Sequence, residues 1–266
     1  MFDQYKRHIT YLRISVTDRC NLRCTYCMPA EGVELLKHSD ILTFDEIVEF
    51  TRTAVAMGVN KVRLTGGEPL VRKGIVDLVA MLSKIDGVSD LSMTTNAVLL
   101  KQFAKPLFDA GLMRVNVSLD TLNPHKFRQI TRVGELSDVL EGIKVARQVG
   151  LNPIKLNCVV KESSNEPDAI LVKEYAQKNG FMARFIPLMD LDTGVHGIVE
   201  GGEGGDCINC NRLRLTANGI VKPCLFSDIG YNVRELGARQ AIINAIENKP
   251  ACGGISTTGE FYNIGG

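Results

Sequence analysis

Short runs of apolar and β-branched residues alternate six times with longer segments whose apolar residues follow helical spacing. Each short run predicts a buried strand, and each longer segment predicts a helix that covers the sheet. The predicted strands are Tyr11–Val16, Lys61–Thr65, Leu91–Thr95, Arg114–Leu119, Ile154–Val160 and Ala183–Leu188. The alternation favours an α/β fold of parallel strands joined by right-handed crossovers. Six units are too few for an eight-stranded barrel, so the pattern predicts an incomplete (β/α)6 barrel of the TIM type.

Capping residues mark the ends of the predicted helices. Thr43 and Glu46 have the spacing of a capping box, and Gly58 is suited to end the helix that they begin. Further glycines stand just before later strands, at Gly111, Gly150 and Gly180. Arg72 and Lys73 are expected as exposed helix residues.

The pattern changes after residue 190. Residues 193–206 hold six glycines and few bulky side chains, which predicts a flexible connection. We therefore expect a barrel over residues 1–190, a glycine-rich connection over 191–206, and a small C-terminal module over 207–266.

Composition and charge narrow the classes of function. Of 266 residues, 45% are hydrophobic and 23% charged, as in an ordinary globular protein, and the net charge of +1 gives no general attraction to nucleic acid or membranes. No apolar run is long enough to predict a membrane span, and residues 1–10 lack the core of a signal peptide. We therefore expect a cytoplasmic protein, in which eight cysteines favour metal or redox chemistry over disulfides.

The first cysteine set, Cys20, Cys24 and Cys27, follows the first predicted strand. Three thiolates on one loop suit three irons of a [4Fe-4S] cubane and leave the fourth iron open for a small molecule. A structural zinc site needs a fourth protein ligand. No His or Cys lies nearby to supply it, because the closest, His38, is eleven residues beyond Cys27. Zinc, or three cysteines without a metal, are the alternatives.

This triplet, with Tyr26 before its last cysteine, resembles the signature of the radical S-adenosylmethionine superfamily. The resemblance implies that the open iron binds S-adenosylmethionine, that the cofactor yields a 5′-deoxyadenosyl radical, and that Tyr26 belongs to the cofactor site. The Gly-Gly-Glu sequence at 66–68 is similar to the family motif that holds the methionine amino group, which implicates Gly67 and Glu68. Further positions that match cofactor contacts are Ser118 and Met189. On spacing alone, however, Met189 fits core packing.

The second cysteine set is Cys207, Cys210 and Cys224, again without an adjacent fourth ligand. A zinc site completed by Cys252 is the alternative that the spacing leaves open. The sequence Cys-Asn-Arg-Leu-Arg-Leu-Thr at 210–216 resembles the auxiliary-cluster segment of the GTP 3′,8-cyclase family of molybdenum cofactor biosynthesis. The resemblance implies a second [4Fe-4S] cluster, whose free iron the purine of GTP coordinates.

Basic residues recur on the predicted strands. Arg212 and Arg214 alternate with leucines, so their guanidiniums lie on one side of an extended segment, suited either to phosphate or to a solvated strand face. Other basic residues stand inside parallel strands, where a charge is costly unless a ligand neutralises it. In the cyclase family the matching positions contact GTP, and here they are Arg13, Arg63, Thr94, Lys155, Arg212 and Arg214.

The resemblance implies a lyase that converts GTP to (8S)-3′,8-cyclo-7,8-dihydroguanosine 5′-triphosphate, the first step of molybdenum cofactor biosynthesis. It implies catalytic roles for Arg13 and for the terminal Gly265 and Gly266. It also implies an electron donor such as flavodoxin or ferredoxin, and the cyclic pyranopterin monophosphate synthase as the enzyme that takes the product. A homodimer is the candidate assembly. Because residues 192–206 are shorter than the matching family segment, we expect a shortened member.

Two other functions are compatible with the cysteine pattern. One is a radical S-adenosylmethionine enzyme that modifies peptides and carries an auxiliary cluster. The other is a non-catalytic iron–sulfur protein. The arginine pair at 212 and 214, together with the Gly-Gly end, favours the nucleotide substrate over a peptide.

Overall fold

A computed structural model describes residues 1–29, 31–189 and 197–254. Within these residues, nine strands form one sheet in the order β6-β5-β4-β3-β2-β1-β7-β8-β9. The strands are β1 (Tyr11–Ser15), β2 (Lys61–Thr65), β3 (Asp90–Thr95), β4 (Arg114–Ser118), β5 (Lys155–Val160), β6 (Met182–Pro187), β7 (Arg212–Leu215), β8 (Ile220–Lys222) and β9 (Tyr231–Asn232). β1 to β7 pair in parallel, whereas β8 and β9 pair antiparallel at one edge.

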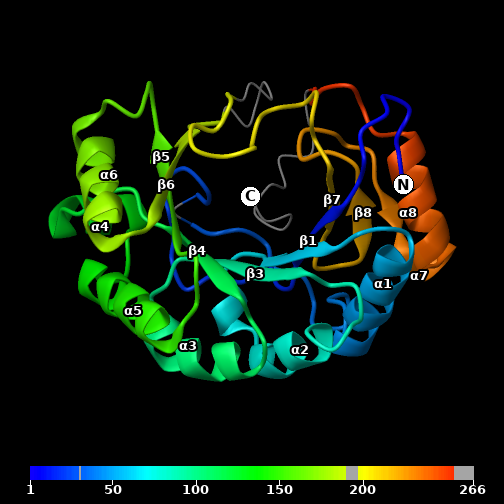
Figure 1. Ribbon diagram of the computed structural model, residues 1–266, viewed down its shortest axis with the longest axis horizontal. Coiled ribbons are helices and arrows are strands. Elements are labelled where there is room, and N and C mark those ends of the chain that lie inside the picture. Colours follow the sequence, from blue (N-terminus) through cyan, green and yellow to red (C-terminus); the bar gives the residue numbers. More distant parts are fainter. Residues whose placement is uncertain (30, 190–196, 255–266) are drawn as a thin grey trace.

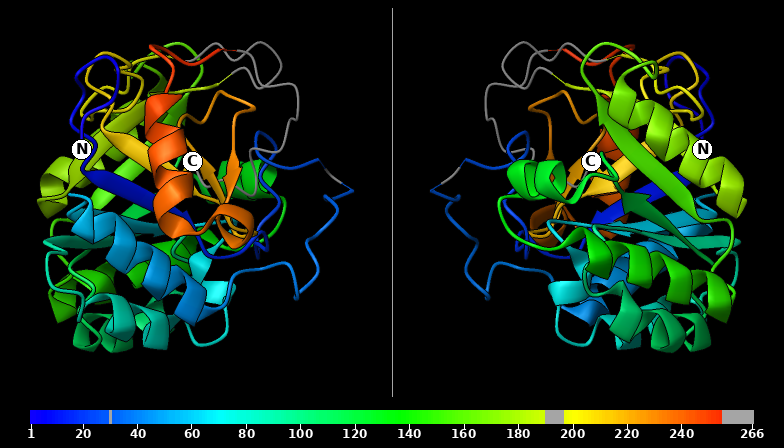
Figure 2. Two further views of the ribbon diagram at one scale, coloured as in Figure 1. Left: turned by 90° about the vertical axis from the view of Figure 1, so that its right-hand side faces the viewer. Right: turned by 90° about the vertical axis from the view of Figure 1, so that its left-hand side faces the viewer.

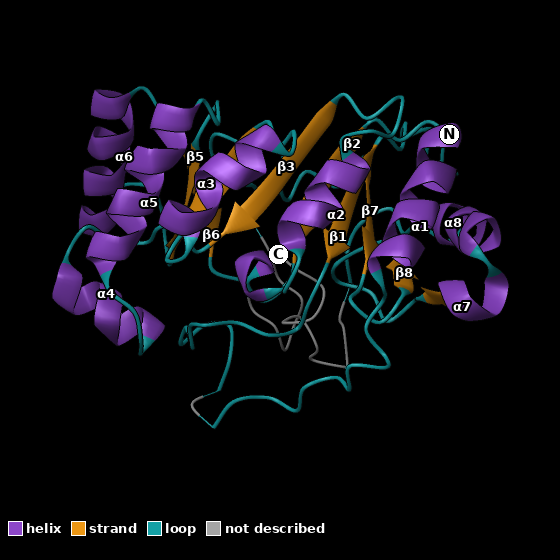
Figure 3. Ribbon diagram, turned by 90° about the horizontal axis from the view of Figure 1, so that it is seen from below, coloured by secondary structure: helices purple, strands orange, loops and turns teal. Residues whose placement is uncertain are grey.

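Helices cover the outer side of this curved sheet and leave its inner side to loops (Figures 1 and 3). They are α1 (Phe44–Ala56), the short 3₁₀ helix η1 (Pro69–Val71), α2 (Ile75–Leu82), α3 (Leu100–Asp109), α4 (Pro124–Thr131), α5 (Leu136–Val149), α6 (Pro167–Asn179), α7 (Val233–Leu236) and α8 (Ala238–Glu247). Strands β1 to β6 are parallel, adjacent in chain order and joined by these helices, so the predicted incomplete barrel of six βα units is confirmed. No helix among the residues described has the length and apolar character needed to cross a membrane.

The apolar strand residues that alternate with the cavity-lining residues are buried on the other face of the sheet. Leu12 and Ile14 of β1 are fully buried, as are Val62 and Leu64 of β2. The predicted capping box is also confirmed: Thr43 Oγ1 accepts from the Glu46 N–H at 3.2 Å, and Glu46 Oε2 accepts from the Thr43 N–H at 2.7 Å. These reciprocal bonds satisfy two donors that the helix cannot satisfy itself.

The C-terminal residues extend the same sheet. β7 pairs with β1 in parallel, and its start is fixed by the Thr10 and Tyr11 N–H groups, which donate to the Asn211 carbonyl at 3.2 and 3.1 Å. α8 then packs beside α1 (Figure 2). The boundaries of the barrel, the connection and the C-terminal module stay a prediction.

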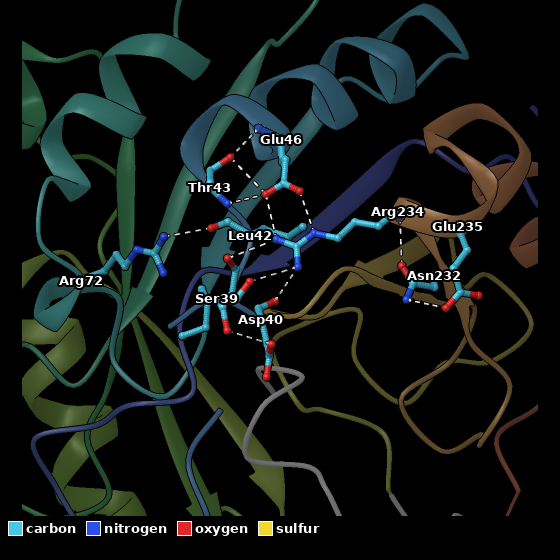
Figure 4. Close-up of polar contacts among 10 residues, drawn as sticks. Ser39, Asp40, Leu42, Thr43, Glu46, Arg72, Asn232, Arg234 and Glu235 are labelled. Carbon is cyan, nitrogen blue, oxygen red and sulfur yellow. Dashed lines mark hydrogen bonds and ion pairs between the residues drawn. The ribbon is translucent and has the colours of Figure 1, made fainter. Parts of the chain in front are cut away.

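One ionic latch joins α7 to the start of α1 (Figure 4). Arg234 contacts both carboxylate oxygens of Glu46, at 2.7 and 3.0 Å. Nearby, Arg72 donates to the Leu42 carbonyl at 2.9 Å and lies over the Phe44 ring. Arg72 is therefore half-buried in a turn, because the carbonyl and the ring together replace its water. Lys73 is exposed, but both residues lie between η1 and α2, so the prediction that they belong to a helix is wrong.

Candidate active site

A cavity of about 410 Å³ opens on the inner side of the sheet, and each of the parallel strands β1 to β7 contributes side chains to it. Its size is that of a small-molecule site. Most of the predicted site residues line it: Arg13, Cys20, Cys24, Tyr26, Cys27, Arg63, Gly67, Glu68, Thr94, Ser118, Met189, Cys207, Cys210, Arg212, Arg214 and Cys224. Lys155 is not among the lining residues, and Gly265 and Gly266 lie outside the described residues.

The first cysteine set lies on the loop that follows β1. The Leu22 N–H donates to the Cys20 sulfur at 3.4 Å, and the Cys27 N–H closes a turn onto the Cys24 carbonyl at 3.0 Å. Burial raises the pKa of Cys20 to about 11 and that of Cys24 to about 12. In such a site thiolates form readily only once cationic metal is bound, because bound metal deprotonates a coordinating thiol. Three free thiols on one loop therefore fit an iron–sulfur cluster.

The glycines at 66 and 67 let one turn pack against this loop. Gly66 has φ +148°, and a Cβ there would lie 2.6 Å from the Thr17 carbonyl oxygen. A Cβ on Gly67 would collide with the Arg19 carbonyl. The pair thus brings Glu68 against the cysteine loop without a side chain in the way.

Glu68 is 1% exposed and accepts three internal hydrogen bonds. The donors are the Leu70 N–H at 3.0 Å, the Thr95 hydroxyl at 2.8 Å and the Asn96 N–H at 2.7 Å. Burial nevertheless raises the pKa of Glu68 to about 7. The carboxylate is held rigidly beside the cavity, and its predicted contact with the cofactor remains a prediction.

Tyr26 is fixed by a residue that sequence reasoning missed. Its hydroxyl donates to Asp120 Oδ2 at 2.8 Å, and Asp120 Oδ1 accepts from the Val159 N–H at 2.8 Å. Burial raises the pKa of both Tyr26 and Asp120. An acid two residues beyond the predicted contact Ser118, at the end of a strand, was the available signal.

The second cysteine set lines the same cavity as the first. Burial raises the pKa of Cys210, but the Lys249 ammonium and the Arg212 N–H outweigh it, and the net shift is downward. Cys252 lies with its sulfur 2.6 Å from that of Cys207 and does not line the cavity. Two thiolates on one tetrahedral zinc, each about 2.3 Å from the metal, would be about 3.8 Å apart. The Cys207 and Cys252 sulfurs are closer together than this geometry requires. In the part of the chain described, no three His, Cys, Asp or Glu side chains group to hold one metal ion.

Arginines form a row across three neighbouring strands. Arg13 of β1 pairs directly with Arg63 of β2 on one side and with Arg214 of β7 on the other. Like charges directly opposite one another destabilise a sheet. Burial lowers the pKa of Arg63 to about 9, which shows how poorly its charge is solvated. The row therefore favours a bound polyanion.

Tyr11 lies among these guanidiniums. The guanidinium carbons of Arg13, Arg63 and Arg212 are 5.4, 5.2 and 5.9 Å from its ring centre. Burial raises the pKa of Tyr11, but these three cations outweigh it and the net shift is downward. The positive potential of these arginines is thus strong enough to lower the pKa of the neutral Tyr11 side chain that lies among them.

Several buried polar atoms of the cavity have no hydrogen-bond partner within the described residues. They are the Tyr11 hydroxyl, Arg13 Nε, Thr94 Oγ1, Asn157 Oδ1, Arg184 Nε and Arg212 Nε. Such atoms are costly unless a ligand or water satisfies them. Arg184 of β6 was not predicted, although a basic residue inside a parallel strand was the same signal that identified Arg13 and Arg63.

Lys155 lies at the start of β5, on the same face as Asn157. Burial lowers the pKa of Lys155, and smaller effects in the same direction come from repulsion by Arg184, Arg114 and Arg63, so that the pKa is about 8. It therefore belongs to the same positive region without reaching the cavity wall.

The described part of the glycine-rich connection covers one side of the cavity. Glu200 pairs with Phe185 of β6 through backbone hydrogen bonds of 3.0 Å in both directions, and Val199 and Glu203 line the cavity. Arg212 Nη2 donates to the Glu203 carbonyl. The connection thus links β6 to β7 across the open side of the partial barrel (Figure 1).

Two solved structures share this fold at low sequence identity. SuiB of Streptococcus suis, bound to S-adenosylmethionine, superposes with a TM-score of 0.69 at 17% identity, over 92% of this chain and 65% of that one. Methylornithine synthase superposes with a TM-score of 0.59 at 17% identity, over 91% and 71%. At these identities the likeness establishes the fold.

Sequence relatives are much closer. GTP 3′,8-cyclase of Thermodesulfovibrio yellowstonii is 41% identical over 94% of each chain, and that of Peptoclostridium acidaminophilum is 42% identical over 94% of this chain and 92% of its own. The first alignment runs over 304 positions, more than this chain's 266 residues, so the relative has residues that this chain lacks. The prediction of a shortened member is therefore confirmed.

The family model of the Radical SAM superfamily matches residues 14–173, which include the first cysteine set and the Gly-Gly-Glu turn. With the relatives at about 40% identity along nearly the whole chain, this protein belongs to the radical SAM superfamily and, within it, to the GTP 3′,8-cyclase family.

Proposed function

We propose that this protein is a GTP 3′,8-cyclase, a lyase that converts GTP to (8S)-3′,8-cyclo-7,8-dihydroguanosine 5′-triphosphate. The observation that carries the proposal is the row Arg63–Arg13–Arg214 in a cavity that both cysteine sets line. A triphosphate supplies the several negative charges that such a row requires. The names of the closely related chains support the same reaction.

At one end of the cavity, Cys20, Cys24 and Cys27 would hold a [4Fe-4S] cluster with one open iron. Tyr26, Gly67 and further lining residues would hold S-adenosylmethionine against it; the others are Glu68, Ser118 and Met189. When bound, this pair of groups supplies a 5′-deoxyadenosyl radical. The protein contributes orientation: Asp120 fixes the Tyr26 ring, and the Thr95 and Asn96 donors fix Glu68.

At the other end, Cys207, Cys210 and Cys224 would hold a second [4Fe-4S] cluster that accepts the guanine base. Between the two ends, the arginine row would bind the triphosphate, with Arg184 and Arg212 offering N–H groups that have no partner among the described residues. Thr94 offers a hydroxyl, and Lys155 adds charge from outside the cavity wall. This arrangement would present the ribose C3′ hydrogen toward the radical source and bring C8 within reach of C3′.

Arg13 is the central cation of the row and the proposed catalytic residue. Its Nε has no partner in the described part of the chain, and its neighbours on both sides are cations, so a bound phosphate is the group that would satisfy it. Gly265 and Gly266 keep their proposed catalytic role on the family resemblance alone.

The proposed reaction needs an electron donor, and its product needs an enzyme that takes it further. One-electron supply points to a flavodoxin or ferredoxin, and the cyclic product would pass to the cyclic pyranopterin monophosphate synthase. We propose a cytoplasmic enzyme, with a homodimer as its assembly.

An anaerobic assay tests the proposal. Reconstituted protein with S-adenosylmethionine, GTP and dithionite is expected to form 5′-deoxyadenosine in a GTP-dependent manner, together with the cyclic nucleotide. Arg13→Ala should keep its iron and its S-adenosylmethionine binding yet lose most GTP turnover, whereas Lys73→Ala, at an exposed turn, should behave like the wild type. Protein with about eight iron atoms that forms no GTP-dependent 5′-deoxyadenosine would refute the proposed substrate.

A further inference from the structure

Lys249 is a lysine buried beside the second cysteine set. It follows α8, is 1% exposed, and is among the largest fully buried side chains of the protein. A buried ammonium is expensive unless anions or acceptors surround it. Its surroundings therefore indicate what it is for.

The ammonium joins the backbone on either side of the second cysteine set. Nζ donates to the carbonyl of Arg212, two residues after Cys210, at 2.8 Å, and to the carbonyl of Pro223, the residue before Cys224. Burial lowers the pKa of Lys249, and negative charge on Cys210 and Cys224 acts against this effect by attracting the ammonium. Two of the three N–H groups of the ammonium are thus bound to the backbone beside Cys210 and Cys224.

Arg7 holds Lys249 in this place. Its guanidinium donates to the carbonyls of Pro250 at 2.7 Å and Ala251 at 2.9 Å, the two residues after Lys249, and to that of Cys207 at 2.8 Å. Asp3 neutralises Arg7 in an ion pair of 2.6 Å that is almost fully buried. The position of Lys249 is therefore set by a network that also holds the loop of Cys207.

We infer that Lys249 is a positioning residue for the second cluster, which holds its thiolate ligands and sets its reduction potential. The inference rests on the proposed function, because it requires a cluster on Cys207, Cys210 and Cys224. Reduction adds one negative charge to a cluster, and a fixed ammonium beside the ligand sulfurs stabilises the reduced form more than the oxidised form. Lys249 therefore raises the potential and makes the second cluster easier to reduce.

The test is a redox titration followed by electron paramagnetic resonance on anaerobically reconstituted full-length protein. Lys249→Met keeps the length and removes the charge, and we expect the midpoint potential of the second cluster to shift to more negative values while the first cluster is unchanged. Lys249→Arg should keep the potential near that of the wild type. Lys173→Met, which removes an equal charge from the exposed face of α6 at the far end of the sheet, is the matched control and should shift neither potential.

The outcomes separate this inference from the proposed function. Wild-type protein that binds only about four iron atoms would refute the second cluster itself, before any variant is compared. Wild type and Lys249→Met with the same iron content and the same potential would overturn the inference alone. Should Lys249→Met lose the second cluster, recovery of that iron in Lys249→Arg supports the inference, and loss in both variants overturns it, because packing and not charge would then be the requirement.

Discussion

The first cysteine set lies within one loop, whereas the second is assembled from separated segments. Cys20, Cys24 and Cys27 follow β1 directly and their turn closes on itself. Cys207 and Cys210 precede β7, and Cys224 follows β8. Their support comes from Arg7, 200 residues before Cys207, and from Lys249. Local sequence can thus build the proposed radical end of the cavity on one strand end, whereas the proposed nucleotide end requires the sheet to be completed by distant segments.

The largest expected difference between the two sets is in the reaction that each supports. Cys24→Ala should abolish reductive cleavage of S-adenosylmethionine, whereas Cys224→Ala should retain a slow cleavage that no longer depends on GTP. The measurement is 5′-deoxyadenosine formed with and without GTP, with iron content determined on the same samples. Loss of all cleavage in both variants, with the first cluster intact in Cys224→Ala, would contradict the division of labour.

The support of the second set by Arg7 gives the next largest effect. Arg7→Met leaves the buried carboxylate of Asp3 without its ion pair and removes the guanidinium donor from three carbonyls. Breaking a buried pair on one side costs about 3–5 kcal/mol, so we expect a loss of that order in the free energy of unfolding, measured by urea denaturation of the apoprotein. The same variant should lose iron from the second set before the first. The double variant Asp3→Ala with Arg7→Met should recover part of the stability, because it removes the unpaired charge.

Asp120 sharpens the comparison at the first set. Asp120→Asn keeps the size of the side chain but replaces the carboxylate that Tyr26 contacts at 2.8 Å. Hydrogen bonds to charged groups contribute about 1.5–3 kcal/mol, so affinity for S-adenosylmethionine should fall by about 10-fold or more, as measured by equilibrium binding to the reconstituted protein. Asp109→Asn, on the exposed end of α3, is the control. Unchanged affinity in Asp120→Asn would show that the Tyr26 ring needs no such support.

The parts that the sequence predicts well are those that its local pattern specifies. Strands β1 to β6 are present where their apolar runs predicted them, with ends that differ by one residue at most. The capping box of α1 follows from two residues three apart. Both belong to elements whose burial or hydrogen bonding is decided within a few residues.

Long-range contacts are what the sequence does not predict. Which edge the four residues of β7 join depends on Asn211 meeting Thr10 and Tyr11, about 200 residues away. Two of the three donors to Glu68 come from the last residue of β3 and the residue after it, and the acceptors of Lys249 lie in β7 and directly after β8. No spacing rule relates such pairs, because their contact exists only after the sheet has formed.

The ion pair between Arg234 and Glu46 gives the smallest expected effect, because it joins only α7 and α1 on the outside of the sheet. With side chains 37% and 34% exposed, the pair is screened by solvent and should contribute about 1 kcal/mol or less. Glu46→Gln isolates this contribution, since Gln can still complete the capping box with Thr43.

Hydrogen bonds from Arg234 lower the pKa of Glu46 from 4.5 to about 2 against the opposing effect of burial, with a further contribution from Thr43. A depressed pKa stabilises the folded protein above the unfolded value, so the difference in unfolding free energy between wild type and Glu46→Gln should be full above about pH 4.5 and should shrink as the pH falls toward 2. Urea denaturation of the apoprotein at pH 7 and pH 3 measures it, with Asp109→Asn of the exposed Lys105–Asp109 pair as a matched control that should show a smaller difference. A difference that keeps its size down to pH 3 and below would mean that Gln disturbs the start of α1. The charge of Glu46 would then not stabilise the contact between α1 and α7.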